Sequence, residues 1–568
     1  LAADEGTGLA ELMKALERPL AVSPADAQAV LRLALPLEPG PLERARLQEW
    51  VGDAWAQGGA HSEDGAEEAA AETPGHRALA AFDAALAALE GAPAGPARAA
   101  AEARVLRKQA GVLLQLRRAD EARAALNRAF DLIHAEPGHP EHPRLRLVLG
   151  KWYLLRGDTA KGIQLLEEGQ RLLIGGQSPA RDQVAILLEL GRALAHQGQF
   201  HRATQHLESA QRMLELEQDP RGRVSIQLAL GQMALSQGEP ERALAVLSEA
   251  LQAARGQGDL LMQAQAHLAL GSVRSILEQV SPALAHLERA ADRFQRLGLT
   301  AHGALARLWH ARTLAALGDL VTSEHEELQA LSASATELQS GGLEAGDRVW
   351  LQAEIAGFRG AWREAQRLHR AASERFGQVG LPWRARLADL RALQAAAREA
   401  RRAGREAPEE VWARLEALKA PVEASASPWL EFEWARAQAL CLACLPPSEP
   451  VDLQALQAWG EALGLARRLQ FPTAVLEAAL EGAEVMLRHG ERLGAMARLQ
   501  DSFASFQQVW LRLPDGHDQS FLGREDLHRY RTAVEAAGLR LPFPERGDPL
   551  ADWTPTQANL PAPGASRA

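Results

Sequence analysis

The sequence predicts an all-α protein in which antiparallel helix pairs stack into a solenoid. The first observation behind this prediction is a recurring Leu-Gly pair, at Leu149-Gly150, Leu190-Gly191, Leu230-Gly231 and Leu270-Gly271. The four glycines are 41, 40 and 40 residues apart, and a fixed period of this length is typical of repeat proteins. The second observation is a composition dominated by alanine, leucine and arginine, with few clusters of β-branched residues, which favours helices over strands.

Each repeat has the pattern of a helix, a tight turn and a second helix. In one copy the first helix is indicated by apolar residues at helical spacing, namely Val184, Leu187, Leu188 and Leu194. Gly198 marks the turn, and the second helix is indicated by Phe200, Ala203, Leu207 and Ala210. Gly191 and Ala203 fall where the two helix axes should cross, because only small residues let two backbones approach closely. Glycine otherwise costs a helix about 1 kcal/mol relative to alanine.

This order of residues resembles the tetratricopeptide repeat (TPR). The matching positions are Leu190-Gly191, Leu194, Gly198, Phe200, Ala203, Leu207 and Ala210, and in the preceding copy Leu149-Gly150, Tyr153, Gly157, Gly162, Leu166 and Gly169. The resemblance implies a right-handed superhelical solenoid with a concave face. The unit is longer than the common TPR of about 34 residues, and we place the extra residues at the seam between units, as at 217–223. HEAT and armadillo repeats have a similar length but lack this Gly/Ala pattern.

The pattern is regular in the middle of the chain and degrades toward both ends. We expect an N-terminal helical lead-in at 1–45, an imperfect TPR-like unit at 46–100 with an acidic insertion at 60–75, a core of regular units at 101–300, degenerate units at 301–512, a capping helix at 513–540 and a flexible tail at 541–568. The insertion is expected to be a mobile surface loop. The tail holds six prolines and little periodicity.

Several elements have identifiable signals within these segments. Helices are predicted at 8–18 and 24–35, the second with Ser23 as its N-cap and Pro24 at its first helical position. A basic-rich helix pair at about 383–419 contains Arg398, Arg401, Arg402 and Arg405, and a final helix at 525–537 closes the stack.

Charge and composition exclude several function classes. The net charge of −11 and the pI of about 5.9 disfavour direct binding of nucleic acid, because contacts with phosphates supply most of its non-specific affinity. No apolar run is long enough for a transmembrane helix, and no secretory signal is visible. Two cysteines fit a reducing compartment, so we expect a cytoplasmic protein. The first residue is not methionine, which fits a processed chain, an unusual start or a piece of a longer polypeptide.

No motif in the sequence indicates catalysis. Cys441 and Cys444 form the single C-x-x-C, and at helical spacing they are expected to be two buried thiols. His134, His139 and His142 lie in a Pro/Gly-rich loop and are expected to be solvated rather than to bind a metal. No P-loop, H-E-x-x-H, G-x-S-x-G or dinucleotide fingerprint is present. We therefore expect no enzymatic activity, no cofactor and no metal site.

The remaining candidate site is the concave face, which in the TPR family is lined by the first helix of each pair. We take the residue after each crossing position as the one that faces it: Lys151, Arg192, Gln232, Ser272, Arg312 and Glu354, with Arg144 nearby. This set predicts a partly basic, peptide-binding groove that accepts an acidic or extended segment. The alternative is that these are ordinary solvated positions. A chaperone C-terminus is disfavoured as the ligand, because the clamp positions Val148, Glu189, Ala229 and Ala269 include no asparagine.

Two functions remain open from the sequence. The first is a non-catalytic TPR scaffold or adaptor that binds a protein or peptide partner. The second is the sensor or regulatory module of a larger bacterial signalling protein, because units of about 40 residues look like those attached to STAND-type ATPases and related regulators. The segment 513–527 is similar to the closing helix of such modules. The identity of the partner, the pathway and the oligomeric state do not follow from the sequence.

Overall fold

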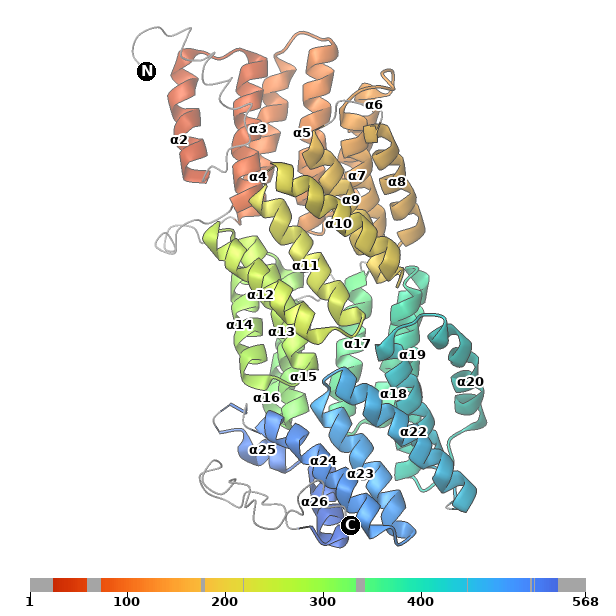
Figure 1. The fold of residues 1–568 in the computed structure, drawn as a ribbon. Coiled ribbons are helices and arrows are strands. Elements are labelled where there is room, and N and C mark those ends of the chain that lie inside the picture. Colours follow the sequence, from red (N-terminus) through yellow and green to blue (C-terminus); the bar gives the residue numbers. More distant parts are fainter. Residues whose placement is uncertain are drawn as a thin grey trace.

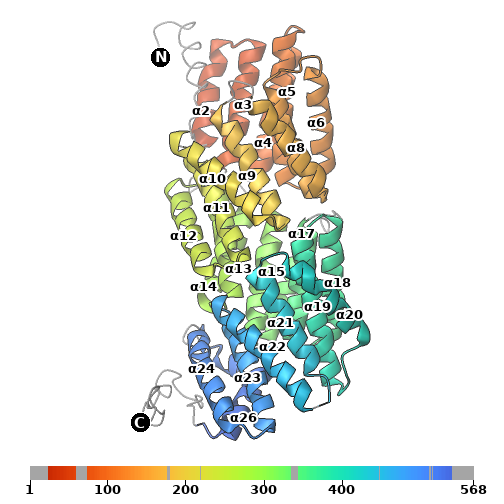
Figure 2. The ribbon, with the colours of Figure 1, turned by 45° about the vertical axis from the view of Figure 1, so that its right-hand side comes forward.

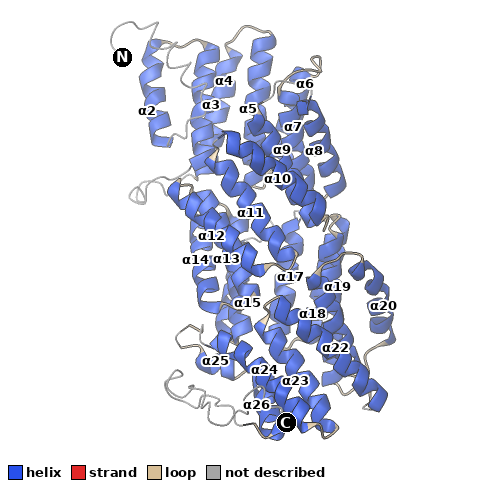
Figure 3. Ribbon diagram, viewed as in Figure 1, coloured by secondary structure: helices blue, strands red, loops and turns tan. Residues whose placement is uncertain are grey.

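The regular structure of this chain is helical throughout the part that can be described. The computed structural model describes residues 24–58, 73–174, 179–217, 219–333, 343–446, 448–510, 513–514 and 516–539. Within these ranges every regular element is a helix (Figure 3). Successive helices pair antiparallel and stack along an elongated body, with α2 and α26 at opposite ends (Figure 1). The predicted all-α solenoid of antiparallel helix pairs is confirmed.

The helix bounds follow the expected pairing. The elements are α2 (Pro24–Ala34), η1 (Leu35–Leu37), α3 (Pro41–Gly58), α4 (Pro74–Glu90), α5 (Pro96–Gln115), α6 (Ala119–Ile133), α7 (Glu141–Arg156), α8 (Thr159–Ile174), α9 (Ala180–His196), α10 (Phe200–Glu217), α11 (Pro220–Ser236), α12 (Pro240–Gly256), α13 (Leu260–Ile276), α14 (Val280–Arg296), α15 (Thr300–Leu317), α16 (Leu320–Ala333), α17 (Leu343–Phe358), α18 (Trp362–Gln378), α19 (Pro382–Arg402), α20 (Glu409–Glu423), α21 (Pro428–Leu442), α22 (Glu449–Arg468), α23 (Pro472–Arg488), α24 (Arg492–Trp510), α25 (Asp518–Leu522) and α26 (Glu525–Ala537). The helix predicted at 525–537 is α26.

The segment boundaries fall at slightly different places from the expected ones. Residues 45 and 100 lie inside α3 and α5, because prolines at 41 and 96 already begin those helices. The expected single capping helix at 513–540 holds two helices, α25 and α26. The predicted helix at 8–18, the N-cap Ser23, most of the insertion at 60–75 and the tail from 541 lie outside the described residues.

The long repeat unit is explained by its helices. From α11 to α14 each helix has 17 residues, and each connection, such as 237–239 and 257–259, has three. Two such helices and two such connections make up the 40-residue period. The residues added to a common TPR therefore lengthen the helices, and in these copies the seams stay as short as the turns within a unit.

Glycine has two separate roles in the unit, as the pattern predicts. In the turn, Gly238 has a φ of 77°, and its N–H and that of Glu239 donate to the carbonyls of Leu235 and Ala234, which closes the end of the helix. At the crossing, a Cβ added to Gly231 would lie 2.5 Å from Leu247 Cγ. No real side chain tolerates that distance, so the predicted close approach of the two helices is confirmed.

Segments about 200 residues apart lie against one another, because one turn of the superhelix packs on the next. Hydrogen bonds join Thr159 Oγ1 to the carbonyl of Val379, the Thr473 N–H to Glu278 (2.9 Å), and Arg524 to the carbonyl of Ala316 (2.6 Å), across 220, 195 and 208 residues. About five units thus make one superhelical turn. We use the name first turn for α3–α16, which are seven pairs and so somewhat more than one geometric turn, and second turn for the five pairs of α17–α26. α17–α20 lie below α7–α10 in both views (Figures 1 and 2).

A row of aromatic side chains lies along the second turn and meets the first turn at one end. Trp383, Trp429 and Phe471 stand at the beginnings of α19, α21 and α23. Their ring centroids are 5.9 Å apart from Trp383 to Trp429 and 5.7 Å from Trp429 to Phe471. Trp383 also meets Phe200 of the first turn at 6.1 Å. Edge-to-face aromatic contacts of this kind add stability beyond their buried area, so the two turns pack as one body.

Candidate binding cavities

Each superhelical turn encloses a cavity along its axis. The first cavity has a volume of about 760 Å³ and is lined mainly by the first helices of the pairs from α3 to α17. Its basic lining residues are Arg107, Lys108, Arg117, Lys151, Arg156, Arg192, Arg221 and Arg348. Only Asp53 and Glu189 contribute carboxylates to the same wall. In a chain with a net charge of −11, this wall is a local concentration of positive charge.

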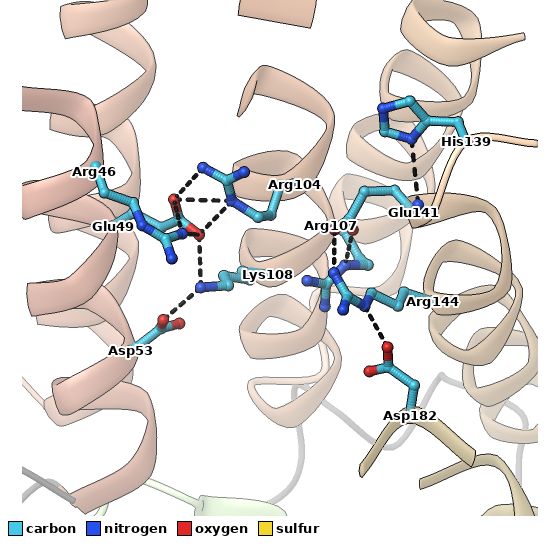
Figure 4. Close-up of polar contacts among 10 residues, drawn as sticks. All are labelled: Arg46, Glu49, Asp53, Arg104, Arg107, Lys108, His139, Glu141, Arg144 and Asp182. Atoms are coloured by element: carbon cyan, nitrogen blue, oxygen red, sulfur yellow. Dashed lines mark hydrogen bonds and ion pairs between the residues drawn. The ribbon is translucent and has the colours of Figure 1, made fainter. Parts of the chain in front are cut away.

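Two carboxylates that pair with these cations, Glu49 and Glu141, are not among the residues that line the cavity, and Figure 4 shows both with their partners. Glu49, which is 1% exposed, accepts from Arg104 Nε at 2.9 Å and pairs with Lys108 Nζ at 2.6 Å. Burial alone would raise the pKa of Glu49, but Lys108, Arg104 and Arg46 together hold it well below its ordinary value. Lys108 also contacts Asp53, so it bridges the carboxylates of Asp53, in the wall, and Glu49, outside it.

A second group of ion pairs joins α5, α7 and α9 (Figure 4). Glu141, at the start of α7, pairs with Arg107 Nε at 2.6 Å and Arg144 Nη1 at 2.7 Å. Arg144 Nε also pairs with Asp182 at 2.8 Å. These partners keep the pKa of Glu141 below its usual range in spite of its burial. Arg144 thus links neighbouring helices and is not among the residues that line the first cavity.

Three of the predicted groove residues do line the first cavity. Lys151 Nζ and Arg192 Nη1 share Glu189 at 3.1 and 3.3 Å, and Arg192 Nη2 donates to the carbonyl of Ser225 at 3.2 Å. Gln232 lines the same wall one unit further on. Burial and the charges of Arg384 and Arg192 lower the pKa of the neighbouring His196 to about 3, so this imidazole adds no charge at neutral pH. Two cations therefore face one carboxylate here.

The remaining predicted residues lie elsewhere. Ser272 donates to the carbonyl of Ala269 in its own helix at 2.9 Å. Arg312 is buried, donates to the carbonyl and hydroxyl of Ser275 at 3.2 and 3.0 Å, and pairs with Glu354 at 3.5 Å. Neither lines the first cavity. Glu354 lines the second cavity instead.

The second cavity, of about 820 Å³, lies in the second turn. Its basic lining residues are all arginines: Arg359, Arg391, Arg398, Arg401, Arg402, Arg436, Arg524 and Arg529. Its carboxylates are Glu354, Glu477, Glu481, Glu525 and Asp526. The sequence marks 383–419 as basic-rich, but the partners from α23 and α26 come together only in the fold.

A further residue that sequence reasoning missed is Glu278, in the turn between α13 and α14. Its carboxylate accepts from the Thr473 N–H at 2.9 Å and from the Thr473 hydroxyl, so it caps the beginning of α23 from the first turn. Glu278 has a φ of 56°, at the position held by Gly157, Gly198 and Gly238 in the preceding copies. The sequence held one signal for this residue: the copy that contains Glu278 lacks the glycine found at this turn position in the three copies before it.

The cysteine and histidine positions differ in part from the prediction. Cys441 is buried, whereas Cys444 is only partly so; burial raises the pKa of the Cys441 thiol to about 12. His142 is not a solvated loop residue: it lies in the first turn of α7, is 9% exposed, and its Nε2 lies 2.9 Å from the carbonyl of Glu136. Among the described residues, no group of three or more His, Cys, Asp or Glu side chains is placed to hold a metal.

The described helices include none that is both long enough and apolar enough to cross a membrane. The fold and its axial cavities define the class of protein as an α-solenoid of helix pairs. Residues 101–174, which form most of α5 to α8, match the family model of the tetratricopeptide repeat. The resemblance to the TPR is thereby confirmed for this segment, and TPR solenoids generally serve protein–protein interaction. No curated protein matches the sequence.

Several solved structures are similar to this chain at low identity. A Rap protein complexed with competence and sporulation factor is 15% identical with a TM-score of 0.43, covering 56% of this chain and 92% of that chain. A STAND protein with a tetratricopeptide repeat sensor from Pyrococcus horikoshii is 10% identical with a TM-score of 0.32, covering 68% and 53%. Yeast Tom70 is 12% identical with a TM-score of 0.29, covering 76% and 95%.

Proposed function

We propose that this chain is a non-catalytic adaptor whose first cavity binds an acidic, extended segment of a partner protein in the cytoplasm. The observation that carries the proposal is the wall of eight arginines and lysines against two carboxylates. A cavity of about 760 Å³ falls within the range of natural binding pockets and accommodates a few residues of peptide.

The chemistry of the wall favours carboxylate side chains as ligands. Lys151 and Arg192 share the single carboxylate of Glu189, so an incoming carboxylate would find an under-compensated pair of cations. Lys151 is 43% exposed and keeps access to a ligand. Gln232 supplies an amide that can hydrogen-bond to a peptide backbone. Electrostatic complementarity of this type contributes specificity and rate of association more than raw affinity.

The test measures binding of a fluorescent oligo-glutamate peptide to the full chain by fluorescence anisotropy. The double variant Lys151→Gln/Arg192→Gln should weaken binding by about tenfold or more, since each lost charged hydrogen bond contributes roughly 1.5–3 kcal/mol. The matched control is Arg202→Gln/Arg242→Gln, which removes the same charge from exposed positions of α10 and α12. Equal weakening in both double variants would reject the cavity as the site.

The partner itself can be captured from the same position. A photo-crosslinking amino acid in place of Gln232 should attach to a partner, and the attached peptide, identified by mass spectrometry, should be rich in Asp and Glu. Attachment to a segment without acidic residues would contradict the proposed ligand chemistry.

A second candidate function is the sensor module of a larger signalling protein that responds to a partner or a small effector. The contacts between the two turns favour it, because a ligand that separates Glu278 from Thr473 would open the superhelix. Small-angle X-ray scattering with and without a bound ligand distinguishes the two functions. An increased radius of gyration on binding supports the sensor, and an unchanged radius supports the adaptor.

A further inference from the structure

The second cavity is lined by eight arginines, and one of them, Arg402, makes no ion pair with a carboxylate in the described part of the chain. A continuous ladder of ion pairs runs from Arg312 through Glu354, Arg391, Glu433, Arg436 and Glu477 to Arg398. Four arginines therefore share three glutamates. Arg402, beside this ladder on α19, donates to the carbonyl of Gly360 at 3.1 Å. The other lining arginines, Arg359, Arg401, Arg524 and Arg529, each pair with a carboxylate as well, so Arg402 is the lining arginine for which no carboxylate partner is found among the described residues.

The arginines of this wall also repel one another. Burial lowers the pKa of Arg436, and the neighbouring charges of Arg398 and Arg391 act in the same direction against the attraction of Glu477. An additional anion near these guanidinium groups would relieve this repulsion, which grows as water is excluded.

Buried polar atoms in the same wall also lack partners. His369 and Gln394 are 4% and 1% exposed and line the cavity. His369 Nδ1, Gln394 Oε1 and Arg391 Nε make no hydrogen bond within the described part of the chain. Buried groups of this kind are normally satisfied. Arg391 Nε and, in the tautomer that protonates it, His369 Nδ1 are donors that an anion could satisfy, whereas Gln394 Oε1 is an acceptor and would need a donor such as water.

The lining arginines of the second cavity come from several helices. Arg401 and Arg402 follow Arg398 on α19 by three and four residues. Arg529 of the closing helix α26 lines the same cavity and pairs with Glu481 at 2.9 Å and Glu484 at 2.8 Å. Arg398 also lies over the ring of Trp362, with 5.0 Å from its Cζ to the ring centroid, which fixes the direction of its guanidinium. The rigid fork of arginine matches the oxygens of phosphates and carboxylates.

We propose that the second cavity binds a compact polyanion with at least two phosphate or carboxylate groups, gripped between Arg398, Arg402 and Arg529. A volume of about 820 Å³ suits a small molecule rather than a folded domain. The ligand would join the solenoid to its closing helix, so binding should stiffen the C-terminal end of the chain. This site is separate from the first cavity and does not depend on the function proposed for it.

The test is isothermal titration calorimetry of the full chain with two probes, inorganic pyrophosphate and citrate. We expect one saturable site for at least one probe. Arg402→Gln should weaken binding by about tenfold, and Arg398→Gln/Arg402→Gln by more, since each change removes a charged donor. Changing Arg398 and Arg402 leaves no carboxylate without an ion-pair partner, because Glu477 keeps its pair with Arg436. Circular dichroism confirms that each variant is folded.

Two controls separate this site from general attraction of anions. Arg405→Gln removes one exposed charge just after α19, outside the cavity, and should leave the affinity unchanged. Lys151→Gln/Arg192→Gln, which tests the first cavity, should also leave it unchanged.

The outcomes decide both the site and the ligand chemistry. If the chain binds pyrophosphate alone, the ligand carries phosphate groups, and if it binds citrate alone, the ligand carries carboxylates. Binding of both probes means that the site accepts either kind of group. Absence of saturable binding to the wild-type chain, or equal weakening by Arg405→Gln, would overturn the proposal.

Discussion

The two superhelical turns use the same helix-pair architecture to build interiors of different kinds. In the first turn, carboxylates such as Glu49 and Glu141 are not part of the cavity wall, although they pair with its cations (Figure 4). In the second turn, Glu354, Glu477 and Glu481 stand in the wall among the arginines and tie one helix to the next. The difference teaches that the same repeat can line a cavity in two ways, because the charges along the first helices decide whether the carboxylates are part of the cavity wall or are excluded from it.

The largest expected effect comes from breaking the ladder of the second turn. Glu433 is fully buried and accepts from Arg391 at 2.6 Å and Gln394 at 2.7 Å. Glu433→Ala leaves Arg391 with only its longer pair to Glu354, 3.6 Å away. Removing one partner of a buried pair typically costs about 3–5 kcal/mol. We expect a loss of stability of that order, measured by urea unfolding of the full chain.

The matching change in the first turn sharpens the comparison. Glu189→Ala removes a carboxylate whose partners, Lys151 and Arg192, are 43% and 31% exposed and can turn to water. Its cost should be clearly smaller than that of Glu433→Ala, and oligo-glutamate should bind the first cavity more tightly. Equal losses of stability in the two variants would remove the distinction between the two interiors.

A smaller effect is expected at the helix crossings. The regular units have glycine there, and a Cβ on Gly231 would overlap Leu247 Cγ at 2.5 Å, whereas the later units have the buried alanines Ala311 and Ala353. Gly231→Ala should destabilise the chain by about 1–3 kcal/mol through overpacking, measured as a lower Tm. Gly256→Ala is the matched control, because nothing lies within 4 Å of its added Cβ and the helix gains up to about 1 kcal/mol. A higher Tm for Gly231→Ala would show that the crossing is not close.

The repeat and its crossings could be predicted from the sequence because they depend on local rules. The spacing of Gly191, Gly198 and Ala203 repeats in successive copies, and each residue acts within its own helix pair. The positions of Lys151, Arg192 and Gln232 on the first cavity follow from the same register. The burial of Arg312 could not be predicted from this register, because the residues around it come from α13, α15 and α17. That arrangement depends on the superhelical pitch, which small rotations between units add up to produce.

The contacts between turns were unpredictable for the same reason. Glu278 lies 195 residues from Thr473, and no local pattern brings the two together. The second cavity likewise needs Arg529 of α26 to meet α19 and α23. The basic stretch at 398–405 was visible in the sequence, but its glutamate partners could be assigned only after the fold had brought the helices together.

The smallest effect concerns pH and the contact that joins the two turns. Burial raises the pKa of Glu278 above its ordinary value of 4.5, although its hydrogen bonds from Thr473 and the charge of Arg524 oppose this. The folded chain therefore holds this proton more tightly than the unfolded chain, so stability is lost as the pH rises from about 4 through the raised pKa. Glu278→Gln should remove this slope, because an amide oxygen still accepts from the Thr473 N–H but does not titrate. The difference in Tm between wild type and Glu278→Gln, followed from pH 4 to pH 8, isolates this group from the other titrating residues. A constant difference across that range would mean that Glu278 does not make the junction between the two turns sensitive to pH.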